Sequence, residues 1–134
     1  MTKNQKSVGM TKKYDITFVG HMCYDEIVPF GGTPRVAPGS AVLCGAMVAA
    51  RVGRKVAVVA KMARKDEEIL QPMKDLGIDC YLIPSAETSY NRVVHFSANV
   101  DEREMTLIKS AGIIDIKEIP ELDSTCVHLA GISD

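Results

Sequence analysis

The feature of this sequence that most restricts its fold is a pair of short continuous runs that suit buried strands. Residues 16–19 read Ile-Thr-Phe-Val and residues 56–60 read Val-Ala-Val-Val-Ala, without the polar alternation of a half-exposed strand. Strands of this kind are typical of parallel sheets that helices cover on both faces. We therefore expect both runs to lie inside a mostly parallel sheet.

The stretch between these runs predicts a helix. Pro38 and Gly39 form a turn, Ser40 is the expected N-cap, and the helix continues through Val52 to stop at Gly53. Its residues are apolar almost all round, which is typical of a helix packed closely between layers. A strand, a helix and a second strand in this order indicate a right-handed crossover in an α/β sheet.

The rest of the chain continues the alternation of strands and helices. A helix with an acidic start is expected from residue 66 to residue 76, delayed or kinked by Pro72. Turn residues dominate 28–35, which therefore predicts short strands at most. The other expected elements are a strand at 80–83, a hairpin at about 90–110 and a last strand at 126–131.

Charge and length limit the functional classes. The 134 residues have a formal net charge of −1, too balanced for a general grip on nucleic acid or on an anionic membrane. Residues 1–13 form a basic segment without the apolar core of a secretory signal, so we expect a flexible tail before one domain at 14–134. These features predict a cytoplasmic protein whose partners are small molecules or other proteins.

Cysteine and histidine spacing predicts no metal site. The four cysteines include no Cys-x-x-Cys pair, and the three histidines lie far apart in the sequence. We expect free thiols that are buried or half-buried, in a reducing compartment. The sequence also lacks the Gly-x-x-x-x-Gly-Lys-Ser/Thr and Gly-x-Gly-x-x-Gly phosphate signatures.

Two places near the expected carboxyl ends of the strands are candidates for ligand binding. Asp25 lies five residues beyond Gly20, and Gly39 with Ser40 opens the first helix. In open α/β sheets, ligands bind at this edge. Each feature also has an ordinary structural interpretation, Asp25 as a turn aspartate and the Gly39–Ser40 pair as a helix cap. Spacing alone leaves both interpretations open.

The chain resembles the N-terminal half of the ribokinase-like (PfkB-type) carbohydrate kinases over essentially all of residues 15–134. That family has a Gly-Gly turn followed by an Ala-rich helix ending in Ala-Arg-Leu-Gly or similar, and the distance from Gly39 to Gly53 matches this pattern. The residues that carry the resemblance are Asp15-Ile16-Thr17-Phe18-Val19-Gly20 with Asp25, the run from Pro38 to Gly53, Val56 to Ala60, Lys65-Asp66-Glu67 and Leu76-Gly77-Ile78-Asp79.

The resemblance implies a fold and a set of substrate-binding residues. The expected fold is a Rossmann-like, mostly parallel sheet with flanking helices and a reduced β lid formed by the 90–110 hairpin. Asp25 would accept hydrogen bonds from sugar hydroxyls, and the backbone at Gly39 and Ser40 would touch the same substrate. Asn91 and Arg92 would face the substrate from the hairpin. The alternative interpretation of both residues is an ordinary structural role in a strand or turn.

Three departures from the family pattern concern the same site. Ser40 stands where the second glycine of the turn is expected. Cys44 stands where many sugar-specific members have asparagine, so the resemblance does not imply ribose or fructose as substrate. Only fourteen positions separate Asp25 from Gly39, which is why we expect a reduced lid.

The resemblance also implies what this chain lacks. The family's Gly-Ala-Gly-Asp motif, with its catalytic base and anion hole, belongs to the C-terminal half and does not occur here. ATP and Mg²⁺ are expected for a full-length member, and no residue here is a candidate to bind them. We expect the acceptor-binding part of an ATP-dependent sugar, inositol or nucleoside kinase, truncated before the ATP-binding half and inactive alone.

One alternative comes from a different class of protein. In this alternative the chain is a non-catalytic α/β module for binding or oligomerisation, which has retained the α/β sheet and lost catalysis. A homodimer through the lid or through the exposed sheet edge is the association expected in this case, because an unpaired edge strand favours pairing with another chain.

Overall fold

The computed structural model describes residues 12–132. Within this range the chain forms eight strands, two α-helices and two 3₁₀ helices. Their bounds are β1 Lys13–His21, β2 Cys23–Val28, β3 Arg35–Gly39, α2 Ala41–Arg51, β4 Val56–Ala63, η1 Arg64–Leu70, α3 Gln71–Asp75, β5 Asp79–Ser85, β6 Ser89–His95, β7 Arg103–Lys109, η2 Ile116–Glu118 and β8 Asp123–Ala130.

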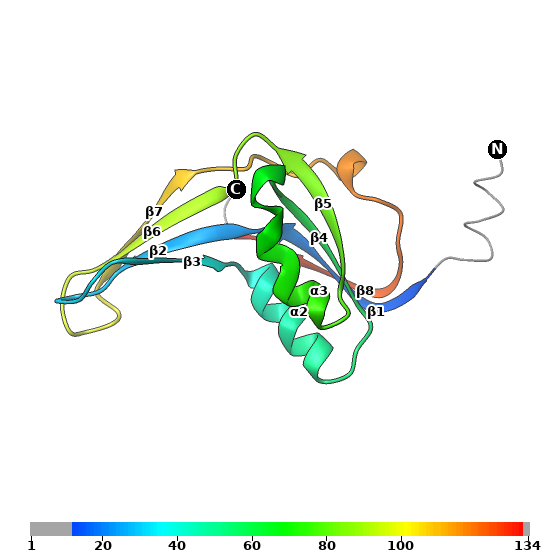
Figure 1. The fold of residues 1–134 in the computed structure, drawn as a ribbon, viewed down its shortest axis with the longest axis horizontal. Helices are drawn as coiled ribbons and strands as arrows, with labels where there is room; N and C mark the ends of the chain where they lie inside the picture. The colour runs from blue at the N-terminus through cyan, green and yellow to red at the C-terminus, as the bar shows by residue number, and fades with distance from the viewer. Residues whose placement is uncertain (1–11, 133–134) are drawn as a thin grey trace.

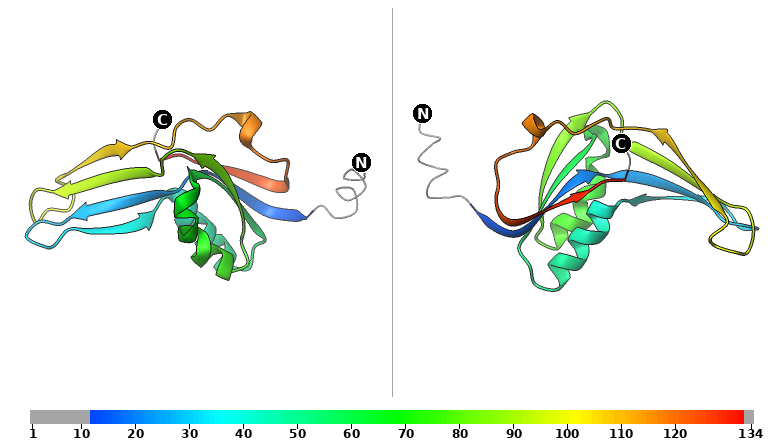
Figure 2. Two further views of the ribbon diagram at one scale, coloured as in Figure 1. Left: turned by 45° about the horizontal axis from the view of Figure 1, so that its top comes forward. Right: turned by 180° about the vertical axis from the view of Figure 1, so that it is seen from behind.

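The strands form two sheets of four strands each. The first has the order β5-β4-β1-β8 and is parallel throughout, while the second has the order β3-β2-β6-β7 and contains parallel and antiparallel pairs. The second sheet extends away from the first as an arm (Figures 1 and 2). Only Met22 separates β1 from β2, so the chain passes directly from one sheet to the other.

The parallel sheet is the core predicted from the sequence. Every residue of β4 is buried, as expected for a central strand. Helices α2 and α3 lie on one face of the sheet, and the segment between β7 and β8 passes over the other (Figure 1). The α2 side is packed with residues such as Phe18, Val42 and Ala46, and the opposite side is filled around Val19 and Val59.

Helix α2 forms where the sequence predicts it. The Ser40 side chain accepts a hydrogen bond from the Leu43 backbone N–H at 3.1 Å, and Gly53 follows the helix with φ +88°. Gly45 faces the ring of Phe18 so closely that a Cβ would lie 2.6 Å from the ring. A glycine at this position allows the helix backbone to approach the sheet.

The second helical segment differs from the prediction. Residues 64–70 form a 3₁₀ helix, and the α-helix begins only at Gln71 with Pro72 in its first turn. Proline fits the first turn because its missing N–H has no partner there in any helix. The expected delay by Pro72 is confirmed, and the apolar spacing before it belongs to a 3₁₀ helix rather than to an α-helix.

The sequence prediction of a lid formed by the 90–110 hairpin was incomplete. The hairpin exists as β6 and β7, and two further strands, β2 and β3, flank the turn-rich stretch 28–35, which contains only their ends as expected. Strand β1 begins at Lys13, so this residue belongs to the sheet rather than to the predicted tail. Residues 1–11 of that tail lie outside the described part of the chain.

Three side chains at the carboxyl end of the parallel sheet contact backbone carbonyl groups of the segment that follows β7. Ser85 donates to the carbonyl of Ala111 at 2.7 Å, and Lys61 Nζ donates to that of Ile113 at 2.7 Å. His21 Nε2 lies 2.6 Å from the Gly112 carbonyl oxygen. Lys61 also pairs with Glu118, whose pKa is lowered first by a backbone N–H and then by this lysine. Three consecutive residues are therefore fixed by three adjacent strands.

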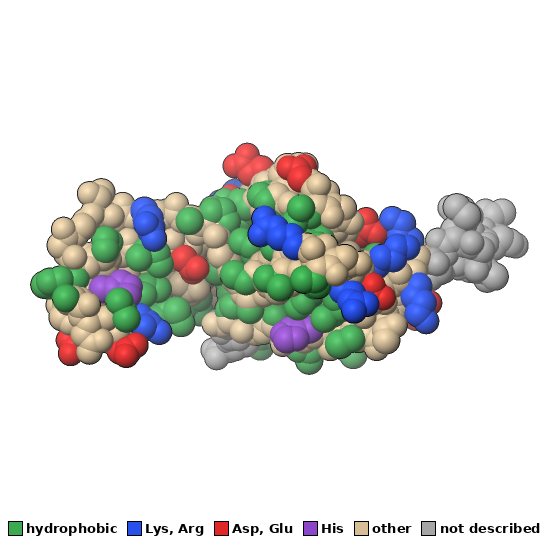
Figure 3. Space-filling view, turned by 90° about the horizontal axis from the view of Figure 1, so that it is seen from below, with side chains coloured by type: hydrophobic (Ala, Val, Ile, Leu, Met, Phe, Trp, Pro, Cys, Tyr) green, Lys and Arg blue, Asp and Glu red, His purple; other side chains and the backbone are tan. Residues whose placement is uncertain are grey.

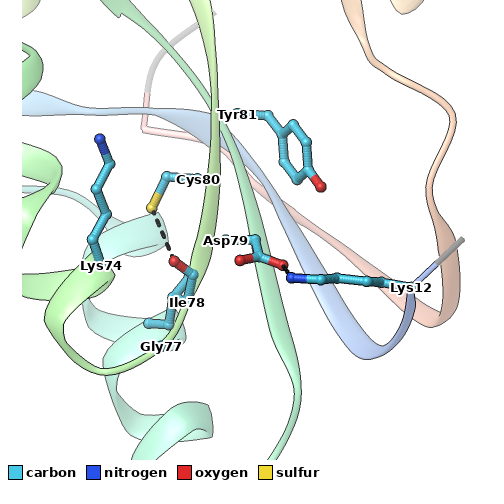
Figure 4. A pocket seen from close by; sticks show the side chains of 7 residues that line it. All are labelled: Lys12, Lys74, Gly77, Ile78, Asp79, Cys80 and Tyr81. Carbon is cyan, nitrogen blue, oxygen red and sulfur yellow. Dashed lines mark hydrogen bonds and ion pairs between the residues drawn. The ribbon is translucent and has the colours of Figure 1, made fainter. Parts of the chain in front are cut away.

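Tyr14, Asp79 and Lys12 form a cluster at the amino end of the sheet. The Asp79 carboxylate accepts hydrogen bonds from the Tyr14 hydroxyl at 2.7 Å and from Lys12 Nζ at 2.9 Å. Figure 4 shows Asp79 and Lys12 paired beside a shallow pocket that Cys80 and Tyr81 also line. The hydrogen bond from Tyr14, followed by that from Lys12, lowers the pKa of Asp79. The cluster links β1 to β5 across β4.

Asp79→Asn is expected to destabilise the protein in a pH-dependent way. A carboxylate with a lowered folded-state pKa contributes stability above its unfolded pKa of about 3.9 and loses that contribution as the pH falls. We expect a loss of about 1 kcal/mol at pH 7, limited by solvent around the exposed lysine. The difference should shrink as the pH falls below about 3.9 and through the lowered folded-state pKa, so it should be smaller at pH 3 than at pH 7. Urea unfolding at both pH values measures it, and an equal difference at both would contradict this account.

The cysteines depart in part from the prediction. All four are free thiols; Cys23 is buried and Cys80 half-buried as expected, but Cys44 and Cys126 are exposed.

Among the helices of residues 12–132, none combines the length and apolar content needed to span a membrane.

Candidate functional site

Asp25 lies where the two sheets meet, on β2, the first strand of the arm in chain order. Its neighbours across the sheet are Ala37 on β3 and Asn91 on β6. Asn91 donates a side-chain hydrogen bond to Asp25 Oδ1 at 3.3 Å, and the Cys23 thiol donates to the same oxygen at 3.4 Å. Asn91 and Cys23 are buried, whereas Asp25 is partly exposed. Two buried donors therefore fix a carboxylate that solvent can reach.

Gly39 completes this cluster from β3. The second carboxylate oxygen, Oδ2, lies so close to Gly39 that a Cβ at this position would overlap it. Glycine is therefore required here by close approach, and its φ lies in the ordinary range. The Asp25 carboxylate therefore lies against the Gly39 backbone, directly before the N-cap of α2.

Ser40 follows in a conformation that L side chains rarely adopt. Its φ of 140° and ψ of 162° lie in a region populated almost only by glycine. The side chain offsets part of this strain, because its oxygen accepts from the Leu43 N–H and its hydroxyl donates to Met22 Sδ at 3.6 Å. The resemblance placed glycine at this position, and the backbone geometry gives the physical reason.

Two substitutions of Ser40 are expected to have opposite effects on stability. Ser40→Gly removes a backbone strain of about 1 to 3 kcal/mol and loses only a few tenths in capping, so it should raise the free energy of unfolding by about 1 kcal/mol. Ser40→Ala keeps the strain and loses the cap, which should lower that free energy by about 1 kcal/mol. Thermal and urea unfolding measure both variants. Equal effects of the two would contradict the assigned strain.

The Cys23 thiol acts as a hydrogen-bond donor at this site. Burial, followed by the negative charge of Asp25, raises its pKa to about 12. A thiol with this pKa stays protonated at neutral pH and is a poor nucleophile. Its role in the cluster is to orient the carboxylate.

Two of the predicted site residues lie apart from the cluster. Arg92 is the strand neighbour of Asn91 and therefore points to the opposite face, where its Nε donates to Glu26 at 2.9 Å. Cys44 is exposed on α2 and lines an apolar groove with Pro38, Met47 and others. The structure thus joins Asp25, Asn91, Gly39 and Ser40, and it does not bring Arg92 or Cys44 to them.

Cys23 is the member of the cluster that the sequence prediction missed. It lies two residues before Asp25, and side chains at positions i and i+2 of a strand share one face. The composition of the segment after Gly20 does not by itself indicate a strand, and without a strand the two side chains have no predicted common face. A prediction of β2 would have placed Cys23 beside Asp25.

A second network positions β2 relative to the parallel sheet. Asp66 accepts hydrogen bonds from the Tyr24 hydroxyl at 3.2 Å and from Thr88 at 2.6 Å. Thr88 in turn accepts from the backbone N–H of Ala63 at the end of β4. Burial and the negative charge of Asp66 raise the pKa of Tyr24. The network joins the first strand of the arm to η1 and to the connection between β5 and β6.

Hydrophobic side chains gather along the middle of the face on which α2 and α3 lie (Figure 3). Leu43, Cys44 and Met47 of α2 line an apolar groove together with Ile69 and Pro72.

In residues 12–132 there is no group of three or more His, Cys, Asp or Glu side chains that could hold a metal ion. The polar cluster around Asp25, with its partly exposed carboxylate, is the candidate for recognition of a polar ligand.

Comparisons with known proteins give matches only at the level of structure. No protein-family model and no curated protein matches this sequence. Among solved structures, a pyrophosphate-dependent kinase in the ribokinase family, complexed with a pyrophosphate analogue and myo-inositol, matches 87% of this chain at 25% identity and a TM-score of 0.77. A sulfate complex of a pyrophosphate-dependent kinase in the same family matches 87% of the chain at 26% identity and a TM-score of 0.79.

A more distant match has the same fold. The nucleoside kinase of Methanocaldococcus jannaschii, an archaeal member of the ribokinase family, matches 89% of this chain at 18% identity and a TM-score of 0.67. The present chain spans about 40% of the length of these structures, with values of 40%, 41% and 44%. It therefore corresponds to part of the matched domains.

Proposed function

We propose that this chain, a partial ribokinase-like fold, is the part of a kinase that binds the phosphoryl acceptor. The observation that carries the proposal is the Asp25 carboxylate, held by Asn91 and Cys23 and lying against the Gly39 backbone. A carboxylate accepts hydrogen bonds from two neighbouring hydroxyl groups, so it suits a polyhydroxylated small molecule. The acceptor class is a cyclitol, a sugar or a nucleoside.

A cyclitol is our first choice within this class. The pyrophosphate-dependent kinase at 25% identity is described in complex with myo-inositol, whereas the nucleoside kinase is only 18% identical. The proposal therefore ranks myo-inositol before sugars and nucleosides.

We further propose that the phosphoryl donor binds mainly outside this chain. ATP with Mg²⁺ is the donor implied by the sequence resemblance. The two solved kinases reported above at 25% and 26% identity are instead described as pyrophosphate-dependent. Residues 12–132 contain no group of three or more His, Cys, Asp or Glu side chains that could hold a metal ion. The role of this chain is to orient the acceptor hydroxyl, and phosphoryl transfer needs groups from a further part of the domain.

Asp25→Asn is expected to weaken acceptor binding by about 10- to 100-fold, because hydrogen bonds to a charged group contribute about 1.5 to 3 kcal/mol. Isothermal titration of the chain with myo-inositol, ribose, fructose and adenosine measures the affinity. Glu26→Gln is the matched control, since Glu26 lies on the opposite face of β2 with Tyr90 and Arg92 as partners. Unchanged affinity of the Asp25 variant, or equal losses in both variants, would contradict the proposal.

The alternative function, a non-catalytic binding or oligomerisation module, is favoured by one observation. Strand β8 lies at the edge of the parallel sheet, and Val127 and Leu129 on it are 57% and 77% exposed. Absence of binding for every acceptor, together with a stable symmetric oligomer by sedimentation, would favour this alternative. In either case we propose that the protein acts in the cytoplasm.

A further inference from the structure

Three consecutive residues, Ala111 to Ile113, form a strap that crosses the end of the parallel sheet between β7 and η2 (Figure 1). The strap has no regular secondary structure, and two of its residues are exposed. Each of its carbonyl groups nevertheless lies beside a side chain of the sheet. These side chains are, in strap order, Ser85 of β5, His21 of β1 and Lys61 of β4. Three adjacent strands therefore determine where the strap lies.

The strap in turn holds the strand that carries Asn91. The backbone N–H of Ala111 donates to the side-chain oxygen of Ser89 at 3.1 Å. Ser89 is the first residue of β6, is buried, and pairs in register with Cys23. Asn91 follows two residues later on the same face of β6 and donates to Asp25. One hydrogen bond therefore connects the strap to the strand that orients the carboxylate.

His21 joins the same strap to the strand that carries Asp25. It is the last residue of β1, and a single residue separates it from β2. Its Nε2 lies 2.6 Å from the carbonyl oxygen of Gly112, the neighbour of Ala111. The contacts form a closed contact ring, which runs from His21 through the strap to β6, across to Asp25 and back along β2.

The contact ring closes the end of the ladder between β2 and β6. Pairing of these strands begins at Cys23 and Ser89, so Asp25 and Asn91 form the third pair from the end. Backbone pairing opens most easily at the end of a ladder, where further partners are lacking on one side. The strap supplies hydrogen bonds at this end from outside the ladder. It therefore helps to keep Asn91 opposite Asp25.

The surroundings of His21 define which of its nitrogens donates. The side chain is buried, and within residues 12–132 its Nδ1 has no hydrogen-bond partner. Because a carbonyl oxygen only accepts, the proton lies on Nε2, and a second proton on Nδ1 would be a buried donor without a partner. Lys61, the register partner of His21 on β4, already places a positive charge on this side of the sheet, paired with Glu118. The strap therefore requires a single neutral N–H from this position.

We propose that His21 is a positioning residue for the polar cluster around Asp25, and that it acts on Asn91 through the strap. This inference rests on the proposed function, since it takes Asp25 as the group that binds the acceptor. The imidazole is buried and bonded to the strap, so it positions the cluster without touching the acceptor. Without its N–H, the Gly112 carbonyl can turn to solvent, and the strap no longer fixes β6 at Ser89.

Two substitutions of His21 separate the effect of the hydrogen bond from that of side-chain volume. His21→Met keeps a side chain of similar length without an N–H, whereas His21→Gln carries an amide N–H close to the position of Nε2. In calorimetric titration with myo-inositol, His21→Met should bind about tenfold more weakly, because the hydrogen bond from Asn91 to a charged group is partly lost. His21→Gln should bind within about twofold of the unsubstituted chain.

Thr17→Val is the matched control for these variants. Thr17 is buried on the same face of β1 as His21, and it donates to Ser124 of β8 rather than to the strap. The substitution removes a hydrogen bond from β1 outside the contact ring. It should therefore lower the stability of the protein and leave the affinity for myo-inositol unchanged.

Ser89→Ala breaks the contact ring at a second point. Groups that act in one network are not additive when they are removed together. Ser89→Ala alone should weaken binding of myo-inositol about tenfold, and its combination with His21→Met should also weaken it about tenfold rather than about a hundredfold. Additive losses in the double variant would show that the two residues do not act through the same strap.

The side-chain amide signals of Asn91 in the NMR spectrum test the positioning role without a ligand. They should shift in His21→Met, return in His21→Gln and stay unchanged in Thr17→Val, with circular dichroism confirming that each variant is folded. Unchanged Asn91 signals in His21→Met, or a shift that His21→Gln does not reverse, would overturn the proposal. If the unsubstituted chain does not bind myo-inositol, the proposed function fails, and the Asn91 signals still decide the role of His21.

Discussion

Gly20→Ala is expected to lower the free energy of unfolding by about 3 kcal/mol, at the upper end of the usual effect of overpacking. A Cβ at Gly20 would overlap the backbone carbonyl oxygen of Ala130 and lie 2.7 Å from Val42. The carbonyl belongs to the neighbouring strand β8, so the overlap is relieved only if β1 and β8 separate. Domains are typically stable by about 5 to 15 kcal/mol, so this loss is a large part of the total.

Gly77→Ala is the control for this substitution. Gly77 has φ +80°, and a Cβ added there would meet no heavy atom within 4 Å, so only backbone strain opposes the change. It should cost about 1 kcal/mol. Urea unfolding monitored by circular dichroism measures both variants. If Gly20→Ala were no more destabilising than Gly77→Ala, the close parallel pairing of β1 with β8 would be wrong.

Gly39→Ala is expected to reduce acceptor affinity by more than about 100-fold while the protein stays folded. The added methyl group would occupy the space of Asp25 Oδ2, so the carboxylate must rotate away from the position set by Asn91 and Cys23. The variant loses the charged acceptor and also the close approach of the ligand to the backbone. Together these cost about 3 kcal/mol of binding free energy.

The control for Gly39→Ala lies at the other end of α2. Gly53→Ala adds a methyl group in open space at φ +88°, so it should lower stability by about 1 kcal/mol and leave myo-inositol affinity unchanged. Calorimetric titration of the two variants separates an effect on the site from an effect on the helix. Retained affinity in Gly39→Ala would exclude a joint role of Gly39 and Asp25.

The parallel sheet could be predicted from the sequence because its signals are local. The run at residues 56–60 is apolar throughout, and β4 is buried throughout. Ser40 and Gly53 mark the ends of α2 by their chemistry, one through its side-chain oxygen and the other through its positive φ. Each signal depends on neighbouring residues alone, and the structure confirms each one.

The arm could not be predicted completely because its strands depend on pairing rather than on composition. Strand β2 contains partly exposed, charged side chains such as Asp25 and Glu26, and β3 contains Pro38 and Gly39. Residues of this kind favour turns when they are considered alone. Strand β2 forms because β6 supplies a partner more than sixty residues away in the chain, and β3 pairs in turn with β2.

The same reason explains which residues of the candidate cluster could be predicted to lie together. Asp25, Gly39 and Asn91 were named from the family pattern, and the structure brings them together. Arg92 is expected to face the substrate with Asn91 from the same hairpin, yet strand alternation places its side chain on the other face with Glu26. Only knowledge of the strand register separates the two.

Chemical-shift mapping of the chain with myo-inositol tests the central claim most directly. Binding at the proposed site predicts the largest amide shifts at residues 23–25, 39–41 and 91, with smaller ones at the Tyr14–Asp79 cluster on the opposite end of the sheet. The same titration of Asp25→Asn should lose these shifts. Shifts confined to the apolar groove beside Cys44, or unchanged in the Asp25 variant, would contradict the assignment of Asp25 as the acceptor-binding residue.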